Sequence, residues 1–188
     1  MTPFFFGYGS LVNRATHPYE NAHRASARGW KRAWRYTNHR DIAFLTAIPC
    51  PNSEIKGLMA EVPNGDWIAL DKREFAYDRV PASDQIDHSI EIPHEVSIYA
   101  IPNGQHIAPS ERHPILLSYL EVVVQGYLNE FGKDGVAEFF DTTDGWDAPI
   151  LDDRAAPLYP RFQSLSRAEK ALTESHMTRM NCRLIERR

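Results

Sequence analysis

The first hundred residues alternate short apolar segments with turns that contain proline or glycine, a pattern that predicts β-strands. Pro49 and Pro51 mark one of these turns, and residues 63–65 mark another. We therefore expect a strand-rich N-terminal half. The predicted strands comprise residues 3–8, 29–36, 42–48, 55–62, about 86–92 and 95–101.

Two shorter segments show the signals of helices. Residues 66–74 interrupt the strands with a helical pattern, which Asp66 is placed to cap at its N-terminus. Near the C-terminus, Ser166 and Glu169 have the spacing of a capping box, which predicts a last helix running toward Met180.

A longer apolar stripe at helical spacing begins after Ser110. Pro114 fits the first turn of this predicted helix, and Gly132 is expected to end it. Strands followed by helices predict an α+β fold, here a single domain over residues 1–188. The stripe consists of Leu116, Leu120, Val123, Tyr127 and Phe131.

Composition narrows the class of protein. The chain has 188 residues, of which 43% are hydrophobic, and a formal net charge of −4, so one sizeable core is expected and a polyanionic partner is not. Two cysteines, Cys50 and Cys182, are too few for a disulfide scaffold or a cysteine-based zinc module. No apolar run has the length of a membrane span or a signal-peptide core, and we expect a cytoplasmic protein.

The loop after the first predicted strand has the strongest chemical signal. Three phenylalanines at residues 4–6 lead into the sequence Gly-Tyr-Gly-Ser-Leu at residues 7–11. Gly7 and Gly9 allow positive φ or close backbone approach, and successive exposed amides form an anion-binding nest. The glycine spacing is not that of a dinucleotide-binding loop. A glycine pair beside a serine also occurs in plain turns.

Five segments in order resemble those of the γ-glutamylcyclotransferase superfamily. Residues 6–11 (FGYGSL) resemble its signature loop, a strand followed by Y-G-S-[LN]. Residues 29–32 (GWKR) and 55–62 (IKGLMAEV) resemble its paired strands, and residues 70–77 (LDKREFAY) resemble its L-D-x-x-E segment. Residues 149–161 look like an element of bacterial members of the ChaC and AIG2-related branch.

This resemblance implies a small mixed β-barrel flanked by helices. It also implies an enzyme that cyclises a γ-glutamyl donor to 5-oxoproline and releases an amine or amino acid. Glu74 falls on the position of the catalytic carboxylate, and no cofactor is implied. The residues expected to bind substrate are Tyr8, Gly9, Ser10, Leu11, Tyr77 and Tyr159.

The residue types suit this chemistry. A γ-glutamyl compound contains both its nucleophile, the α-amine, and its electrophile, the γ-carbonyl, so the enzyme must fold the substrate and move protons. Glu74 can take the ammonium proton and deliver one to the leaving amine, while the loop amides hold a carboxylate or oxyanion. Ser10 lacks the G-x-S-x-G context of a nucleophile. The alternative is that Glu74 belongs to a solvated helix face and that Tyr77 and Tyr159 are core residues.

Two other site types are disfavoured. His88, His94, His106 and His113 show no metal-ligand spacing, so we expect no metal. Trp30, Trp34 and Tyr36 alternate on one strand face, which is expected to point inward, with the arginines at a solvated rim rather than on nucleic acid. The cations of this stretch are Arg24, Arg28, Lys31, Arg32, Arg35 and Arg40.

The sequence leaves two points open. A binding protein of the same fold, which holds a small carboxylate-bearing ligand without turnover, is the second functional hypothesis. The identity of the γ-glutamyl compound and the oligomeric state are not determined. Phe75 and Ala76 follow Glu74 where ChaC-type proteins tend to carry glycine, so the entrance to the site is expected to differ.

Overall fold

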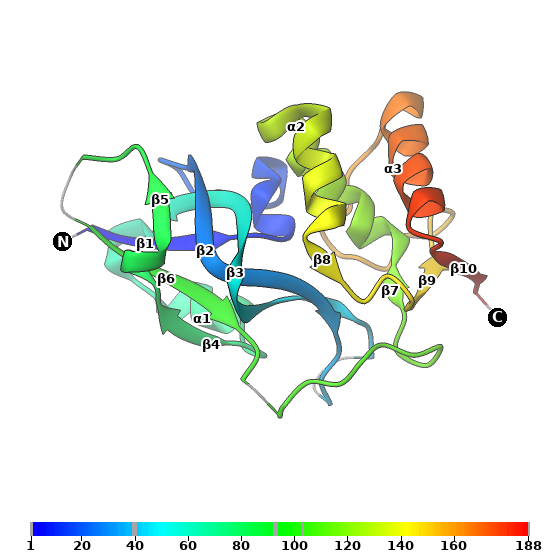
Figure 1. Ribbon diagram of the computed structural model, residues 1–188, viewed down its shortest axis with the longest axis horizontal. Coiled ribbons are helices and arrows are strands. Elements are labelled where there is room, and N and C mark those ends of the chain that lie inside the picture. The colour runs from blue at the N-terminus through cyan, green and yellow to red at the C-terminus, as the bar shows by residue number, and fades with distance from the viewer. Residues whose placement is uncertain (1, 39–40, 92–93, 103, 188) are drawn as a thin grey trace.

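The computed structural model describes residues 2–38, 41–91, 94–102 and 104–187. A curled mixed sheet occupies one side of the molecule, and the two longer helices with a small second sheet occupy the other (Figure 1). Within the described residues the large sheet has strand order β4-β6-β1-β3-β2-β5, and β8 pairs with β2. Its strands are β1 (Thr2–Gly7), β2 (His23–Arg35), β3 (Phe44–Glu61), β4 (Asp78–Pro81), β5 (Ile86–His88), β6 (His94–Ala100) and β8 (Thr143–Asp144).

Strand β1 lies in the middle of this sheet. It pairs antiparallel with β3, with Phe4 opposite Glu61, and parallel with β6, with Phe4 opposite Val96. Phe4 and Phe6 face the main core, whereas Phe5 packs in a second cluster on the opposite face. Burial on both faces explains why the strand is continuously apolar instead of alternating.

Strands β2 and β3 correct the sequence prediction. The strand predicted at 29–36 begins at His23, and the two strands predicted at 42–48 and 55–62 are one strand, β3. The expected turn at Pro49 and Pro51 is absent. The register between β2 and β3 shifts at Gly29, which has a left-handed φ of +79°, so residues 50–53 of β3 form a bulge. Proline is tolerated in a bulge because the residue there does not have to donate a hydrogen bond to the neighbouring strand.

Several other boundaries differ from expectation. The strand predicted at about 86–92 is shorter than expected, since β5 ends at His88, and residue 92 lies outside the described residues. Strand β4 was not predicted. The helix predicted at 66–74 is α1 (Ile68–Arg73), and its N-cap is Trp67 rather than Asp66. The Asp66 carboxylate still accepts a hydrogen bond from the Ile68 N–H, at 2.8 Å. The described part of the chain also contains four short 3₁₀ helices, Ser10–Val12, Arg14–Thr16, Pro63–Gly65 and Ser83–Gln85.

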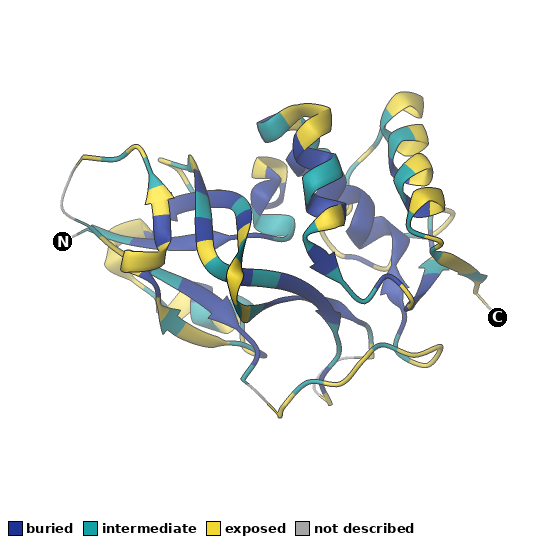
Figure 2. Cartoon of the chain, in the orientation of Figure 1, coloured by how far each residue is buried: buried dark blue, intermediate teal, exposed yellow. Residues whose placement is uncertain are grey.

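The long predicted helix is α2 (Leu117–Asp141), which is largely buried (Figure 2). It begins later than Ser110, because the short strand β7 (Ile115–Leu116) comes first and Pro114 precedes that strand. Gly132 does not end α2. It breaks the helix with a left-handed φ of 69°, and the helix resumes directly after it.

The second sheet was not predicted. Within the described residues it has three parallel strands, β7, β9 (Pro149–Asp152) and β10 (Arg183–Glu186), with β9 in the centre. The last helix, α3 (Arg167–Arg179), is confirmed together with its capping box: the Glu169 N–H donates to the Ser166 hydroxyl and the Ser166 N–H to the Glu169 carboxylate. The predicted α+β class is therefore confirmed.

Two smaller expectations concern the cysteines and the membrane. Cys50 and Cys182 are both free thiols. Among the described residues, no helix combines the length and the apolar character that a membrane crossing requires.

Gly126 on α2 provides a test of the packing between this helix and the loop after β1. A glycine-to-alanine change inside a helix normally stabilises a protein by about 1 kcal/mol. Here the new Cβ would lie only 2.7 Å from the Asn13 backbone nitrogen. We expect Gly126→Ala to lower the free energy of unfolding by about 1–3 kcal/mol in urea titrations. Ser175→Ala on the exposed side of α3 is the control, and a stabilised Gly126→Ala variant would contradict the packing described here.

Candidate active site

A pocket opens where the loop after β1 meets the end of α1 and the first turns of α2. Its walls are residues 6–11, Leu45, Glu74, Tyr77, Tyr99 and Tyr119, and it holds about 360 Å³ of empty space including its open mouth. We call it the loop pocket. The loop that the sequence singled out and the predicted catalytic carboxylate thus face one space.

A second pocket adjoins the loop pocket. Ser10, Glu74, Tyr77 and Tyr119 line both of them, and the second pocket holds about 560 Å³ including its mouth. We call it the outer pocket. Its further walls include Arg73, Tyr159 and Arg161. Glu74 therefore lies at the junction of the two pockets.

The glycines of the loop are needed for space rather than for positive φ. Gly9 has a φ of −119°, and neither Gly7 nor Gly9 is among the described glycines with positive φ, so of the two roles considered from the sequence only close backbone approach remains. A Cβ on Gly7 would lie 2.6 Å from the Leu11 Cβ, and one on Gly9 would lie 3.0 Å from the Tyr119 hydroxyl. A Cβ at Gly7 would therefore require the Leu11 side chain to shift, and a Cβ at Gly9 would crowd the Tyr119 hydroxyl.

Hydrogen bonds close the loop into a tight turn. The Val12 N–H donates to the Gly9 carbonyl, and the Ser10 carbonyl accepts from the Asn13 N–H and the Thr16 hydroxyl. No hydrogen bond within the described part of the chain uses the N–H of Gly9, Ser10 or Leu11. Three successive amides therefore have no described partner within the protein, and their binding to an anion stays a prediction.

Glu74 is the residue that ends α1. Its N–H donates to the Leu70 carbonyl, and its own carbonyl accepts from the Tyr77 N–H, so its backbone is held on both sides. Its carboxylate lies 3.1 Å from Arg73 Nε, and the two side chains are only 17% and 11% exposed.

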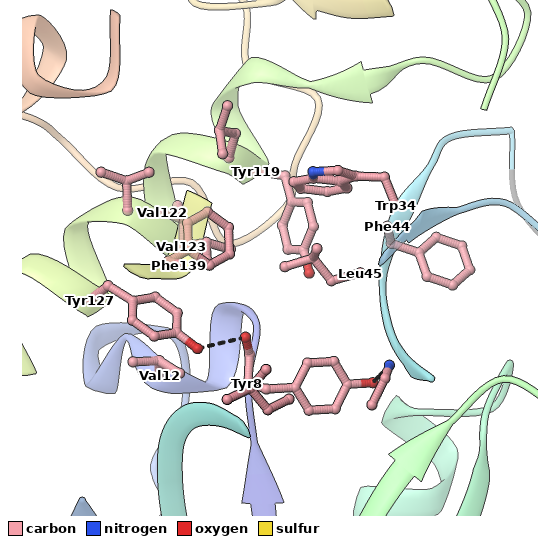
Figure 3. Close-up of a cluster of buried hydrophobic side chains, with 14 of the residues drawn as sticks. Tyr8, Val12, Trp34, Phe44, Leu45, Tyr119, Val122, Val123, Tyr127 and Phe139 are labelled. Carbon is pink, nitrogen blue, oxygen red and sulfur yellow. Dashed lines mark hydrogen bonds between the residues drawn. The ribbon is translucent and has the colours of Figure 1, made fainter. Parts of the chain in front are cut away.

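The tyrosine hydroxyls around Glu74 are mostly occupied by the protein. Tyr8 donates to the Tyr99 carbonyl and accepts from the Ala47 N–H, so its side chain points into the barrel (Figure 3). Tyr77 donates to the Leu45 carbonyl at 2.6 Å. These two predicted binding residues shape the wall of the pocket with their rings.

Tyr119 is a residue that sequence reasoning missed. It projects from the first turn of α2, is buried, and contacts the rings of Tyr159 and Trp34. Burial raises the pKa of its hydroxyl well above the usual value, with Tyr159 and Glu74 adding to the effect, so the hydroxyl stays protonated. The sequence signal for this residue was a tyrosine beside the apolar stripe of the predicted helix, and such a tyrosine can equally be a core residue.

Tyr159 reaches the outer pocket on a loop that Asp153 fixes. The buried Asp153 carboxylate accepts hydrogen bonds from the Ser118 N–H, the Ser118 hydroxyl and the Leu158 N–H. It thereby ties the loop to the start of α2, which places Tyr159 against Tyr119. The segment 149–161 thus lines the outer pocket with Tyr159 and Arg161, and its Asp153 carboxylate anchors it to α2.

The predicted solvated arginines include one that is buried. Trp30 and Trp34 point inward as expected, and Tyr36 is half-buried, but Arg32 on the same face is fully buried as well. Four oxygens satisfy its guanidinium, which is why the strand can carry a charge inward. Three of the other cations pair with acids: Arg24 with Glu130, Arg28 with Asp87 and Lys31 with Asp144. Arg35 donates to the Trp34 carbonyl, and Arg40 lies outside the described residues.

Histidine clusters do not form a metal site in the described chain. The rings of His88 and His94 are 4.3 Å apart between centroids, yet no three His, Cys, Asp or Glu side chains of the described residues are placed to hold a metal ion.

Comparison with known proteins places the chain in a family. Residues 4–100, slightly more than half of the chain, match the sequence model of the ChaC-like proteins. The chain therefore belongs to the ChaC-like protein family. No curated protein matches it significantly.

Solved structures share its fold at low sequence identity. A γ-glutamyl cyclotransferase has a TM-score of 0.56 and 13% identity, covering 93% of this chain and 99% of that one. The uncharacterised human protein loc79017 has a TM-score of 0.56 and 13% identity, covering 91% and 97%. YkqA from Bacillus subtilis has a TM-score of 0.56 and 15% identity, covering 73% and 52%. The γ-glutamylcyclotransferase-like fold predicted from the sequence is confirmed.

The contact between Gly9 and Tyr119 can be tested by a double-mutant cycle. Gly9→Ala adds a methyl group 3.0 Å from the Tyr119 hydroxyl, so we expect it to lower the free energy of unfolding by about 1–3 kcal/mol. In a Tyr119→Phe background the hydroxyl is gone, and the loss should shrink by about 0.5 kcal/mol or more. Urea denaturation measures both. Strictly additive effects would mean that the loop does not pack against Tyr119.

Proposed function

We propose that this chain is a γ-glutamyl cyclotransferase that converts a γ-glutamyl compound to 5-oxoproline and releases an amine or amino acid. One observation carries the proposal: Glu74 lines one pocket together with Gly9, Ser10 and Leu11, whose N–H groups form no hydrogen bond within the described part of the chain. Family membership and the shared fold support it.

The reaction needs positioning more than a protein nucleophile. The α-amine of the substrate attacks its own γ-carbonyl, forming a carbon–nitrogen bond as the carbonyl electrons move to oxygen. The resulting tetrahedral intermediate then expels the leaving nitrogen. Holding an intramolecular pair in a near-attack pose can supply an effective molarity of about 10⁵ M or more. The confined loop pocket is suited to that task.

Glu74 accounts for the proton transfers. The α-ammonium must lose two protons to become the lactam N–H, and the leaving nitrogen gains two to depart as an ammonium ion. A single carboxylate between the two nitrogens can accept each proton from the first and give it to the second, and it ends in its starting state. Glu74 lies where the loop pocket meets the outer pocket, which is where such a relay is required.

The loop amides supply the second requirement. An oxyanion or a substrate carboxylate needs fixed donors that cost no reorganisation during the reaction. The N–H groups of residues 9–11 are held by the turn that follows them. The leaving group then extends into the outer pocket, between Tyr159 and the guanidinium groups of Arg73 and Arg161.

A binding protein without catalysis is the second candidate. The ion pair between Arg73 and Glu74 favours it, because a structural carboxylate is typically held by a neighbouring cation. The two candidates differ in whether 5-oxoproline is released. Mass spectrometry of 5-oxoproline, after incubation with γ-glutamyl peptides, amino acids and amines, separates them.

Glu74→Gln tests the assignment of the proton carrier. The amide keeps the shape of the side chain but cannot accept the ammonium proton. We expect kcat for 5-oxoproline release to fall by about 10²–10⁴, the range of general acid–base catalysis, with little change in affinity for 5-oxoproline.

The matched control is Glu174→Gln. Glu174 lies on α3, its carboxylate pairs with Arg154, and it lines neither pocket. The variant should retain full activity. Near-normal turnover by Glu74→Gln would assign the proton transfers to another group. A Glu74→Gln protein that unfolds at a much lower temperature would mark the carboxylate as structural.

Turnover should also be independent of metal ions. The described residues offer no cluster of three coordinating side chains, and the proposed reaction uses a carboxylate and backbone amides instead. Protein treated with EDTA and then desalted should release 5-oxoproline at the untreated rate. Loss of activity that zinc or manganese restores would refute this account of the site.

A further inference from the structure

Arg32 is a fully buried cation whose described partners are all neutral. Its guanidinium donates to the carbonyls of Tyr8 (3.2 Å) and Lys56 (2.9 Å) and to the hydroxyls of Tyr127 (2.8 Å) and Thr142 (2.6 Å). No acidic side chain in the described part of the chain forms an ion pair with it. A buried charge without a counterion is expensive to maintain, so it calls for a reason beyond stability.

The position of Arg32 suggests that reason. The Tyr8 carbonyl belongs to the loop that lines the loop pocket, and its oxygen accepts a hydrogen bond from the Tyr127 hydroxyl (Figure 3). The Arg32 guanidinium donates to the same oxygen. Neither Arg32 nor Tyr127 lines the loop pocket or the outer pocket. Arg32 and Tyr127 therefore contact the loop from the core and not from either pocket.

Peptide geometry connects this contact to the pocket. In a trans peptide the carbonyl oxygen and the following N–H point in opposite directions, and the described residues contain no cis peptide bond. Because the Tyr8 oxygen points toward Arg32 and Tyr127, the Gly9 N–H points away from them, toward the side on which Gly9 lines the pocket. The hydrogen bonds that fix the Tyr8 carbonyl therefore also fix the direction of the Gly9 N–H.

We propose that Arg32 and Tyr127 are positioning residues that fix the Tyr8–Gly9 peptide so that the Gly9 N–H points toward the γ-glutamyl group, with the positive charge of Arg32 behind the loop. This inference rests on the proposed function. The guanidinium acts on the substrate only through the loop: it polarises the Tyr8 peptide and keeps a cation behind an anion-binding turn.

The four contacts also explain why the residue is an arginine. A planar fork with five donors can serve two carbonyls and two hydroxyls at once, whereas a lysine ammonium has three donors on a flexible stem. The Tyr127 hydroxyl lies 2.9 Å from the Tyr8 oxygen and 2.7 Å from the Lys56 oxygen, but it has one hydrogen to donate. Arg32 is what allows both carbonyls to be satisfied together.

The primary test is Tyr127→Phe, which keeps the ring and removes the hydroxyl behind the loop. Three quantities are measured: the ¹⁵N–¹H chemical shift of the Gly9 amide, the dissociation constant of 5-oxoproline, and kcat against KM for 5-oxoproline release. We expect the Gly9 resonance to move and kcat to fall about tenfold or more, with a smaller change in KM, because the misdirected donor acts on the transition state.

Two further variants sharpen the test. Arg32→Lys keeps the charge but not the fork, and we expect kcat to fall about 100-fold, the loss typical of one removed oxyanion donor. Thr173→Val is the matched control, since it deletes the hydroxyl of a buried threonine on α3 that donates to the Glu169 carbonyl, and Thr173 lines neither pocket. This variant should lower the melting temperature without moving the Gly9 resonance or kcat.

The outcomes separate this inference from the proposed function. Unchanged Gly9 resonance, affinity and kcat in a folded Tyr127→Phe protein would overturn the positioning role, even if Arg32→Lys fails to fold. If the wild-type protein releases no 5-oxoproline from any γ-glutamyl compound, the proposed function fails. The Gly9 resonance then decides alone whether the pair orients the peptide.

Discussion

The architecture depends on the pairing of β1 with β3 on one side and with β6 on the other. The ladder with β3 reaches the last residue of the strand, with Gly7 opposite Leu58, and the ladder with β6 reaches Phe6, opposite Ile98. Two flanking partners and two buried faces leave β1 no freedom of register, because a slip of one residue would move every phenylalanine to the wrong face. The loop at residues 7–13 therefore leaves the sheet at one defined point.

The candidate site is built from segments that are distant in sequence. The loop after β1 supplies amides, the end of α1 supplies Glu74, α2 supplies Tyr119, and the loop after β9 supplies Tyr159. Each is fixed by a specific interaction rather than by general compaction, such as the three hydrogen bonds that Asp153 accepts. Precise placement of such groups is what a reaction within one substrate molecule requires.

Local signals made much of this predictable. The apolar run before a Gly-Tyr-Gly-Ser loop, the capping box of α3 and the carboxylate at the end of α1 are encoded within a few residues. The continuity of β3 through two prolines could not be predicted from local sequence, because it depends on a bulge opposite Gly29 in β2. The second sheet joins strands far apart in the chain. The burial of Arg32 was missed because its partners come from four separate segments.

The central claim is that the loop amides and Glu74 together bind the γ-glutamyl group. A crystal structure of the protein with 5-oxoproline, the product of the proposed reaction, tests this most directly. The account predicts the lactam in the loop pocket, with an oxygen on the amides of residues 9–11 and the ring nitrogen within hydrogen-bond distance of Glu74. A product molecule bound elsewhere, or an empty loop pocket at a saturating concentration, would contradict it.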